Sequence, residues 1–260
     1  MLLRRITKHV TEQNWFAVLL DFLIVVFGLF IGLQVNNWNE NRINARIADS
    51  YIERLKVDLD TEIKYFNHVI DYYRIPRDHA LAALAVYNKT AKDLNVGFLV
   101  DMYQASQSIN IVNRHGTYDE LISTGRITLI TSEDTRTMLN NYYESSRMRE
   151  RTLEINTFVP YRKLVRMHMD ESIQMEIRQH CNDIYTITDK NYYYVQLPTN
   201  CDISVPDNLV KQDIEMLLGN EEIRQELRFQ LTSLDALLGA LDNAIDTTEI
   251  TLAKLKASKP

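Results

Sequence analysis

One stretch near the N-terminus limits what this chain can fold into. The residues from Trp15 to Val35, WFAVLLDFLIVVFGLFIGLQV, are apolar except for Asp21 and one glutamine. As a helix, about 20 residues rising 1.5 Å each cross the ~30 Å hydrocarbon layer of a bilayer. Trp15 and Trp38 bracket the run, and indole rings favour the two membrane interfaces. The pattern predicts a transmembrane helix over 15–35.

Two other interpretations fit this stretch less well. The buried core helix of a soluble protein is rarely apolar over such a length. A cleavable signal peptide has a shorter apolar core followed by a small-x-small cleavage site. The sequence LQVNNWNEN after the core offers no such site, so we expect an uncleaved anchor.

The charges before the helix predict its orientation. Arg4, Arg5 and Lys8 stand against Glu12 in the tail 1–14. Short basic segments before a first membrane helix usually stay in the cytoplasm. We therefore expect a cytoplasmic basic tail and a C-terminal domain that is periplasmic or extracellular.

Composition favours helices and argues against nucleic-acid binding. The chain has only 7 glycines and 5 prolines among 260 residues, so few tight turns are available. Its net charge of −6 is opposite to the basic face that phosphate recognition needs. These features predict an all-α fold and no nucleic-acid partner.

Apolar residues at helical spacing continue beyond the apolar run. They recur about every 3.75 residues from Ile43 to Tyr73, close to the α-helical repeat. Proline disfavours helix at the residue before it, so Pro76 is expected to end this helix. The predicted organisation is a helical stalk over 36–75 and an antiparallel helical bundle over 76–260.

Helical patterns also occupy most of the predicted bundle. Gly125 is expected to end a short helix, and Asn220 is expected to cap the last helix. Ser132 is expected to begin a long helix that reaches about Arg178 and is kinked at Pro160. The remaining predicted helices lie at 77–90, 92–107 and 118–123, and from Asp207 to about Gly219.

The two cysteines, Cys181 and Cys201, bound a segment rich in Tyr, Thr and Asn that breaks the helical pattern. This insertion, 181–201, is the expected place for a short hairpin. A disulfide there would contribute about 3 kcal/mol under the chain-entropy model and fits an oxidising compartment. Two free thiols in a cytosolic domain are the alternative, and no metal site is expected.

Two blocks of the chain resemble an uncharacterised bacterial family of single-pass membrane proteins, a domain of unknown function. The first runs from Leu20 to Leu59 and includes the acidic residue early in the helix, Gly28 and the exit sequence LQVNNWNENR. The second is TYDELISTGRITLITSEDTRTMLNNYY, from Thr117 to Tyr143. The chain departs from the family in having Asp where the family usually has Glu, and in the cysteine-bounded segment. The resemblance implies a membrane anchor with a helical domain outside the cytoplasm, and it brings no assigned activity. The expected location is the bacterial inner membrane.

Asp21 is the most informative residue of the apolar run, because a carboxylate at the centre of a bilayer costs about 2.5–3.5 kcal/mol. At about 100° per residue, Val25, Gly28 and Gly32 lie on the same side of the helix as Asp21. Small residues four apart let helices approach closely. This pattern predicts a helix–helix contact face. Two alternatives remain: an interfacial Asp with incidental glycines, or a proton-carrying carboxylate like that of the stator or plug subunits of proton-driven motors.

The sequence contains no arrangement of residues typical of catalysis, such as a GxSxG, HExxH or Walker motif. We therefore expect a non-enzymatic, cofactor-free module that acts in sensing, scaffolding or assembly of an envelope complex. Its expected partners are the lipid bilayer and a second copy or another membrane protein, contacted through the membrane helix. The alternative functions are an accessory, stator-like subunit of an ion-driven complex using Asp21, and an enzyme with an unrecognised site.

Overall fold

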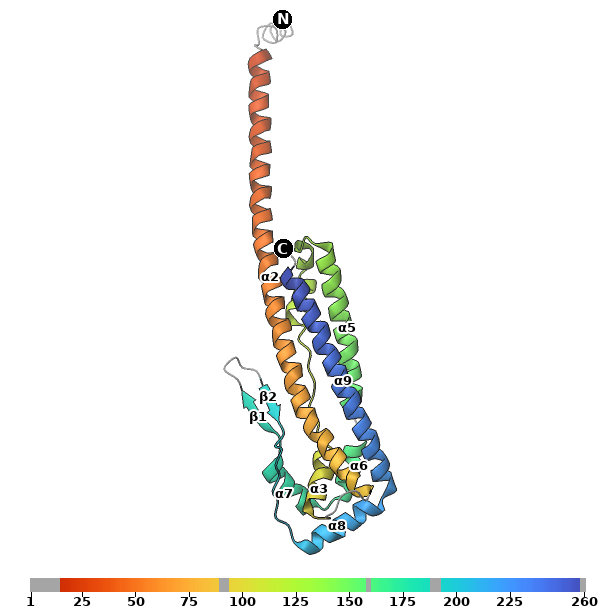
Figure 1. Cartoon of the computed structure of the whole chain (residues 1–260). Helices are drawn as coiled ribbons and strands as arrows, with labels where there is room; N and C mark the ends of the chain where they lie inside the picture. Colours follow the sequence, from red (N-terminus) through yellow and green to blue (C-terminus); the bar gives the residue numbers. More distant parts are fainter. Residues whose placement is uncertain (1–14, 89–93, 158–159, 188–192, 258–260) are drawn as a thin grey trace, which may run out of the picture.

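The computed structural model describes residues 15–88, 94–157, 160–187 and 193–257. The predicted basic tail 1–14 lies outside the described residues. The fold is all-α, as predicted, with one small two-stranded sheet. Figure 1 shows an elongated bundle from which a single helix projects.

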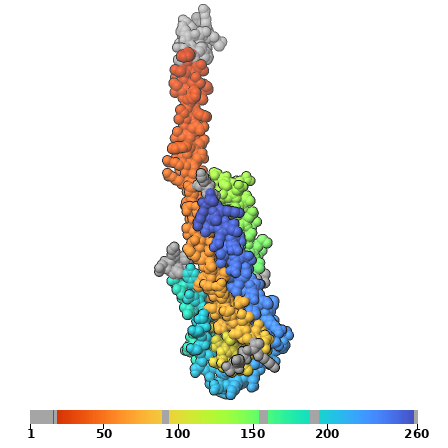
Figure 2. Space-filling view, in the orientation of Figure 1, coloured from red at the N-terminus to blue at the C-terminus, as the bar shows by residue number. Residues whose placement is uncertain are grey.

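The projecting helix is the first part of α2, which runs unbroken from Trp15 to Tyr87 over 73 residues. Its N-terminal portion stands alone above the bundle, and the space-filling view shows the same bare rod (Figures 1 and 2). Among the side chains of α2 that the structure describes, the first buried one is Ala48, followed by Tyr51 and Ile52. The segment expected to be a stalk is therefore exposed only at its start, and the rest of it belongs to the bundle core.

The predicted break at Pro76 is wrong, because Pro76 lies inside α2 and the helix continues for eleven more residues. Proline in a helix removes one backbone hydrogen bond and costs about 3 kcal/mol. Core contacts on both sides offset that cost. Tyr72 and Tyr73 are buried before the proline, and Ala80 and Ala83 after it.

Two short helices follow α2. Asn95 begins α3 (Val96–Gln104) as its N-cap, accepting a hydrogen bond from the backbone amide of Gly97 at 2.8 Å. An irregular segment then leads to α4 (Gly116–Ser123) and a 3-10 turn, η1 (Arg126–Leu129). Gly125 between them has φ +68°, so a residue without a side chain is needed there.

The helix expected to run from Ser132 to Arg178 is three helices. They are α5 (Glu133–Thr157), α6 (Tyr161–His168) and α7 (Glu171–Cys181). The predicted cap is confirmed, because the Ser132 hydroxyl accepts from the Thr135 amide at 3.2 Å. The unexpected break before α7 has a local cause: the Asp170 carboxylate accepts from the Ser172 amide at 2.8 Å and caps a new helix.

The cysteine-bounded segment forms the predicted hairpin, in which β1 (Ile184–Ile187) pairs antiparallel with β2 (Tyr193–Gln196). Two helices complete the chain, α8 (Asp207–Gly219) and α9 (Glu221–Ala257). As expected, Asn220 caps α9, its side-chain oxygen accepting from the Glu222 amide at 3.0 Å.

The core lies where α9 packs along α2 and α5 (Figure 1). Three groups of buried side chains follow one another down the bundle. The group nearest the projecting helix surrounds Leu55 and Leu59, the middle one surrounds Phe66 and Leu241, and the far one holds α3, α6 and α7 together.

Candidate functional site

The most exposed apolar surface of the structure is the free half of α2. Phe22, Val25 and Leu29 expose 63%, 68% and 69% of their area, and the other large apolar side chains described between Phe16 and Val35 expose between 40% and 72%. Within the described residues, α2 has the only stretch long and apolar enough to cross a membrane, with a mean hydropathy of 2.1 over 18 residues. No other described part of the chain covers this apolar surface.

The four residues of the predicted contact face lie on this free part of α2. Asp21, Val25, Gly28 and Gly32 are all exposed on one continuous helix. A Cβ added at either glycine would meet nothing within 4 Å. The side that carries them is open to a partner helix, and the contact itself stays a prediction.

A short polar segment separates the apolar part of α2 from the bundle. Residues 36–47 rise by about 18 Å as a helix. Asn36 donates to Glu40 at 2.9 Å, and the guanidinium of Arg42 lies 5.3 Å from the ring centre of Trp38. These local contacts along the helix surface support a rigid connection between its two parts.

Inside the bundle, a buried carboxylate joins three helices. Glu62 of α2 is 1% exposed, and its Oε2 accepts from the Tyr142 hydroxyl of α5 at 2.6 Å. The same hydroxyl lies 2.9 Å from the Thr248 hydroxyl of α9, which in turn donates to the Ala244 carbonyl. Burial raises the pKa of Glu62, and the hydrogen bonds from Tyr142 and from the Arg114 amide oppose that rise.

Glu62 is not among the residues predicted from the sequence to form a site. Leu55, Leu59, Glu62 and Phe66 follow one another at helical spacing, so Glu62 occupies a core position in the apolar stripe of α2. A charged residue at such a position needs buried partners. A charged residue within an apolar helical stripe could therefore have pointed to Glu62 from the sequence, although it does not identify Tyr142 as the partner.

A pocket of about 590 Å³ opens between α2 and the chain that leads into α4. The backbone amide of Arg114, in its wall, donates to Glu62 Oε1 at 3.4 Å. Its lining residues are Arg54, Asp58, Tyr65, Val112, Asn113, Arg114, His115, Gly116, Thr117 and Glu120.

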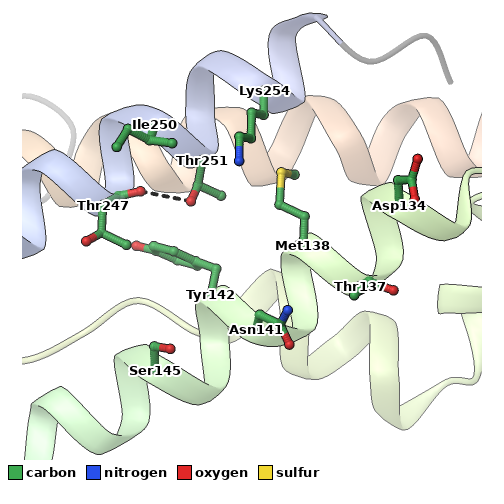
Figure 3. A pocket seen from close by; sticks show the side chains of 10 residues that line it. All are labelled: Asp134, Thr137, Met138, Asn141, Tyr142, Ser145, Thr247, Ile250, Thr251 and Lys254. Carbon is green, nitrogen blue, oxygen red and sulfur yellow. Dashed lines mark hydrogen bonds between the residues drawn. The ribbon is translucent and has the colours of Figure 1, made fainter.

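A second pocket, of about 490 Å³, lies between α5 and α9 (Figure 3). Tyr142 lines it and points its hydroxyl toward α9, while Asp134 and Lys254 lie toward the end of the pocket nearest the termini of the two helices. Because Tyr142 also binds Glu62, the buried polar contacts connect the walls of both pockets.

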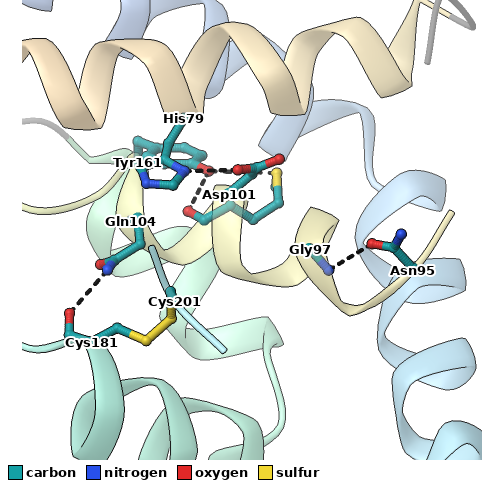
Figure 4. A network of polar contacts seen from close by, with 9 residues as sticks. His79, Asn95, Gly97, Asp101, Gln104, Tyr161, Cys181 and Cys201 are labelled. Carbon is teal, nitrogen blue, oxygen red and sulfur yellow. Dashed lines mark hydrogen bonds and ion pairs between the residues drawn. A yellow bond between two sulfur atoms is a disulfide. The ribbon is translucent and has the colours of Figure 1, made fainter. Parts of the chain in front are cut away.

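The far end of the bundle is held by a different set of contacts (Figure 4). Cys181 and Cys201 form a disulfide with a Cα–Cα distance of 5.3 Å, and Gln104 donates to the Cys181 carbonyl at 2.9 Å. Nearby, His79 Nδ1 lies 2.7 Å from Asp101 Oδ1, so α2 is paired with α3. The disulfide and the Gln104 hydrogen bond connect the end of α7 to Cys201 and to α3, and the His79–Asp101 pair connects α3 to α2.

The described residues contain no group of three or more His, Cys, Asp or Glu side chains placed to hold a metal ion. His79 and Asp101 bind each other, as in a catalytic triad, but among the described residues no nucleophilic side chain is hydrogen-bonded to either of them.

Comparison with known proteins supports the expected membership of an uncharacterised family. No curated protein and no solved structure matches the chain. Residues 21–164, more than half of the chain, match the model of a family described as a family of unknown function (DUF6090), so the protein belongs to that family.

Proposed function

We propose that this protein is a membrane-anchored, non-catalytic helical module that acts in sensing, scaffolding or assembly of an envelope complex. One observation carries the proposal. α2 is a single helix whose first part is apolar and exposed, while its second part belongs to the core of the bundle. Such a helix places its apolar part in a bilayer and holds the bundle beside that bilayer.

The proposed location is the bacterial inner membrane, with the N-terminus in the cytoplasm. The basic residues Arg4, Arg5 and Lys8 precede the helix and favour that orientation. The bundle would then lie outside the cytoplasm. The Cys181–Cys201 disulfide supports this side, because disulfides persist mainly in oxidising compartments.

Assembly through the membrane helix is the second element of the proposal. Asp21 and the Gly28–Gly32 pair share one side of α2 with Val25. In a bilayer the carboxyl group gains from a hydrogen bond to another helix, and the glycines let that helix approach closely. The partner is a second copy of the chain or a different membrane protein.

A second candidate function is that of an accessory, stator-like subunit of an ion-driven complex. The observation that favours it is an acidic residue, Asp21, within the apolar exposed part of α2. In that function Asp21 carries protons and the neighbouring protein has several membrane helices. Asp21→Asn would then abolish activity and leave assembly intact.

Photocrosslinking in living cells from a diazirine residue at Val25 tests the proposal and separates the two candidates. A product of twice the chain's mass supports a self-assembling anchor. A product with a multi-helix membrane protein favours the stator-like subunit. A crosslink to a soluble protein, or chain recovered only in the soluble fraction, contradicts both.

A matched crosslinker at Val26 serves as the control. Val26 lies about 140° around the helix from Asp21, so it points away from the proposed contact face. Equal crosslinking from Val25 and Val26 would show that the contact has no preferred side and would contradict the proposed face.

A further inference from the structure

The pocket between α2 and the 112–117 segment carries charges of both signs in a small space. Its volume of about 590 Å³ lies within the range of small-molecule sites. Two arginines, Arg54 and Arg114, and two carboxylates, Asp58 and Glu120, line it. Arg54 Nη2 and Glu120 Oε2 are 2.5 Å apart, which fixes both side chains beside the opening.

One wall of the pocket suits a carboxylate. α4 begins there at Gly116, and its N-cap, His115, makes no side-chain hydrogen bond to the first turn. Backbone amides at a helix N-terminus attract anions, and the adjacent Arg114 adds a full positive charge. A Cβ added at Gly116 would meet nothing within 4 Å, so there is open space beside this backbone.

Another part of the wall suits a hydrogen-bond donor with a positive charge. Asn113 is 9% exposed, and its Nδ2 donates to the Ser146 carbonyl at 3.1 Å. Its Oδ1 has no hydrogen-bond partner among the described residues, and a buried unpaired acceptor is costly. Together with the carboxylates of Asp58 and Glu120, this oxygen favours an ammonium group.

We propose that this pocket binds a small zwitterion that carries both a carboxylate and an ammonium group, of the α-amino acid class. The carboxylate contacts the N-terminus of α4 and Arg114, and the ammonium contacts Asp58 and Asn113 Oδ1. The pocket offers groups of both charges, so a ligand that carries both charges gains contacts on two walls, whereas a ligand with a single charge gains them on one.

Contacts in the pocket lead directly to the buried carboxylate of the bundle. The Arg114 amide donates to Glu62, and Glu62 binds Tyr142 of α5. A ligand that draws the 112–117 segment inward therefore acts on the residues that hold α2 against α5. This inference goes beyond the proposed function, because binding in the pocket can be measured whether or not α2 lies in a bilayer.

Calorimetric titration of the detergent-solubilised full chain tests the proposal. The titrants are glycine, alanine, serine and glutamate, each up to about 10 mM, and the single-charge compounds acetate, propionate and ethylamine. We expect at least one amino acid to bind and the single-charge compounds to bind at least tenfold more weakly. Equal binding of acetate would mean a simple anion site and would overturn the proposal, as would no binding by any amino acid.

Paired variants locate the site. Asp58→Asn is expected to weaken amino-acid binding about tenfold or more, because it removes the charged partner of the ammonium group. Asp134→Asn, the same change in the pocket between α5 and α9, should leave binding unchanged. Equal effects of the two variants would overturn the assignment to this pocket.

If Asp58→Asn does not fold, photolabelling of the unaltered chain tests the same assignment. A photoreactive α-amino acid with a diazirine side chain should label peptides containing residues 54–65 or 112–120, and unlabelled amino acid should compete with that labelling. Labelling confined to other peptides, or labelling without competition, would contradict the proposal.

Discussion

The Tyr142 hydroxyl donates to the Glu62 carboxylate at 2.6 Å, joining α5 to α2 across 80 residues of sequence. Both side chains are buried, and Thr248 of α9 lies 2.9 Å from the same hydroxyl. A polar contact in this position fixes how the three helices lie against one another, because any slip along their axes would leave buried polar atoms unpaired.

The Glu62→Gln variant is expected to change how stability depends on pH. Burial raises the pKa of Glu62 in the folded chain above its unfolded value of about 4.3. Below the pKa of Glu62 in the unfolded chain, its carboxyl is protonated in both states and the wild type has its full stability. As pH rises from that value through the pKa of Glu62 in the folded chain, the buried carboxyl must ionise and the wild type loses stability. Glutamine carries no charge, so the melting temperature of the variant should rise relative to wild type between about pH 4 and pH 8.

Glu120→Gln is the control for this series. The Arg54 guanidinium lowers the pKa of Glu120 to about 2, so its carboxylate stays ionised over that pH range. The melting difference between this variant and wild type should be nearly constant from pH 5 to pH 8. If the melting-temperature difference between Glu62→Gln and wild type were also constant with pH, burial would not raise the pKa of Glu62 as described.

Removing the disulfide should destabilise the bundle. Cys181 and Cys201 are 20 residues apart, and the bond contributes about 3 kcal/mol under the chain-entropy model. We expect the Cys181→Ala, Cys201→Ala double variant to melt about 6–12 °C lower. Wild type measured with a reductant should match the variant. Equal melting of oxidised wild type and the variant would show that the bond does not support the fold.

Gly28→Leu is expected to disrupt assembly in the membrane, because a leucine prevents the close approach of helices that glycine allows. Resonance energy transfer between labelled chains in vesicles should fall to the level of non-interacting helices. Asp21→Asn retains a hydrogen-bonding side chain and should preserve the transfer. Val26→Leu, on the far side of the helix, is the control. Unchanged transfer in Gly28→Leu would exclude the glycine face as the contact.

A flexible insertion should uncouple the bundle from its anchor. Ala45 lies in the exposed segment between the apolar part of α2 and the first buried residue, Ala48. A Gly-Ser pair inserted after Ala45 should speed the anisotropy decay of a fluorophore placed at Val57 in vesicle-bound protein. An Ala-Ala insertion has the same length and keeps the helix, so its decay should stay slow. Equal decay for the two insertions would contradict transmission through a rigid helix.

The sequence predicted the ends of helices correctly where a single residue determines the local backbone conformation. Gly125 marks a left-handed turn, and Ser132 and Asn220 open helices, because capping depends on atoms within a few residues. The break predicted at Pro76 is wrong because contacts far away in sequence decide the outcome there. The proline removes a helical hydrogen bond, but burial of the tyrosines and alanines around it outweighs that loss of stability.

The polar contacts of the bundle could not be predicted in the same way. Glu62 stands out as a charge in an apolar stripe, yet its partners come from α5 and α9, far away in sequence. The pocket likewise combines α2 with the start of α4. Which side chains meet depends on how the helices align, and helical spacing alone does not determine that alignment.

Depth-dependent fluorescence quenching tests the central claim, that the exposed half of α2 spans a bilayer. The chain has two tryptophans, Trp15 and Trp38, at the ends of the apolar run. In vesicles, lipids brominated near the headgroup should quench both more than lipids brominated at the chain ends. In a variant without these tryptophans, Phe27→Trp should show the reverse. No quenching at any of the three positions would contradict the account.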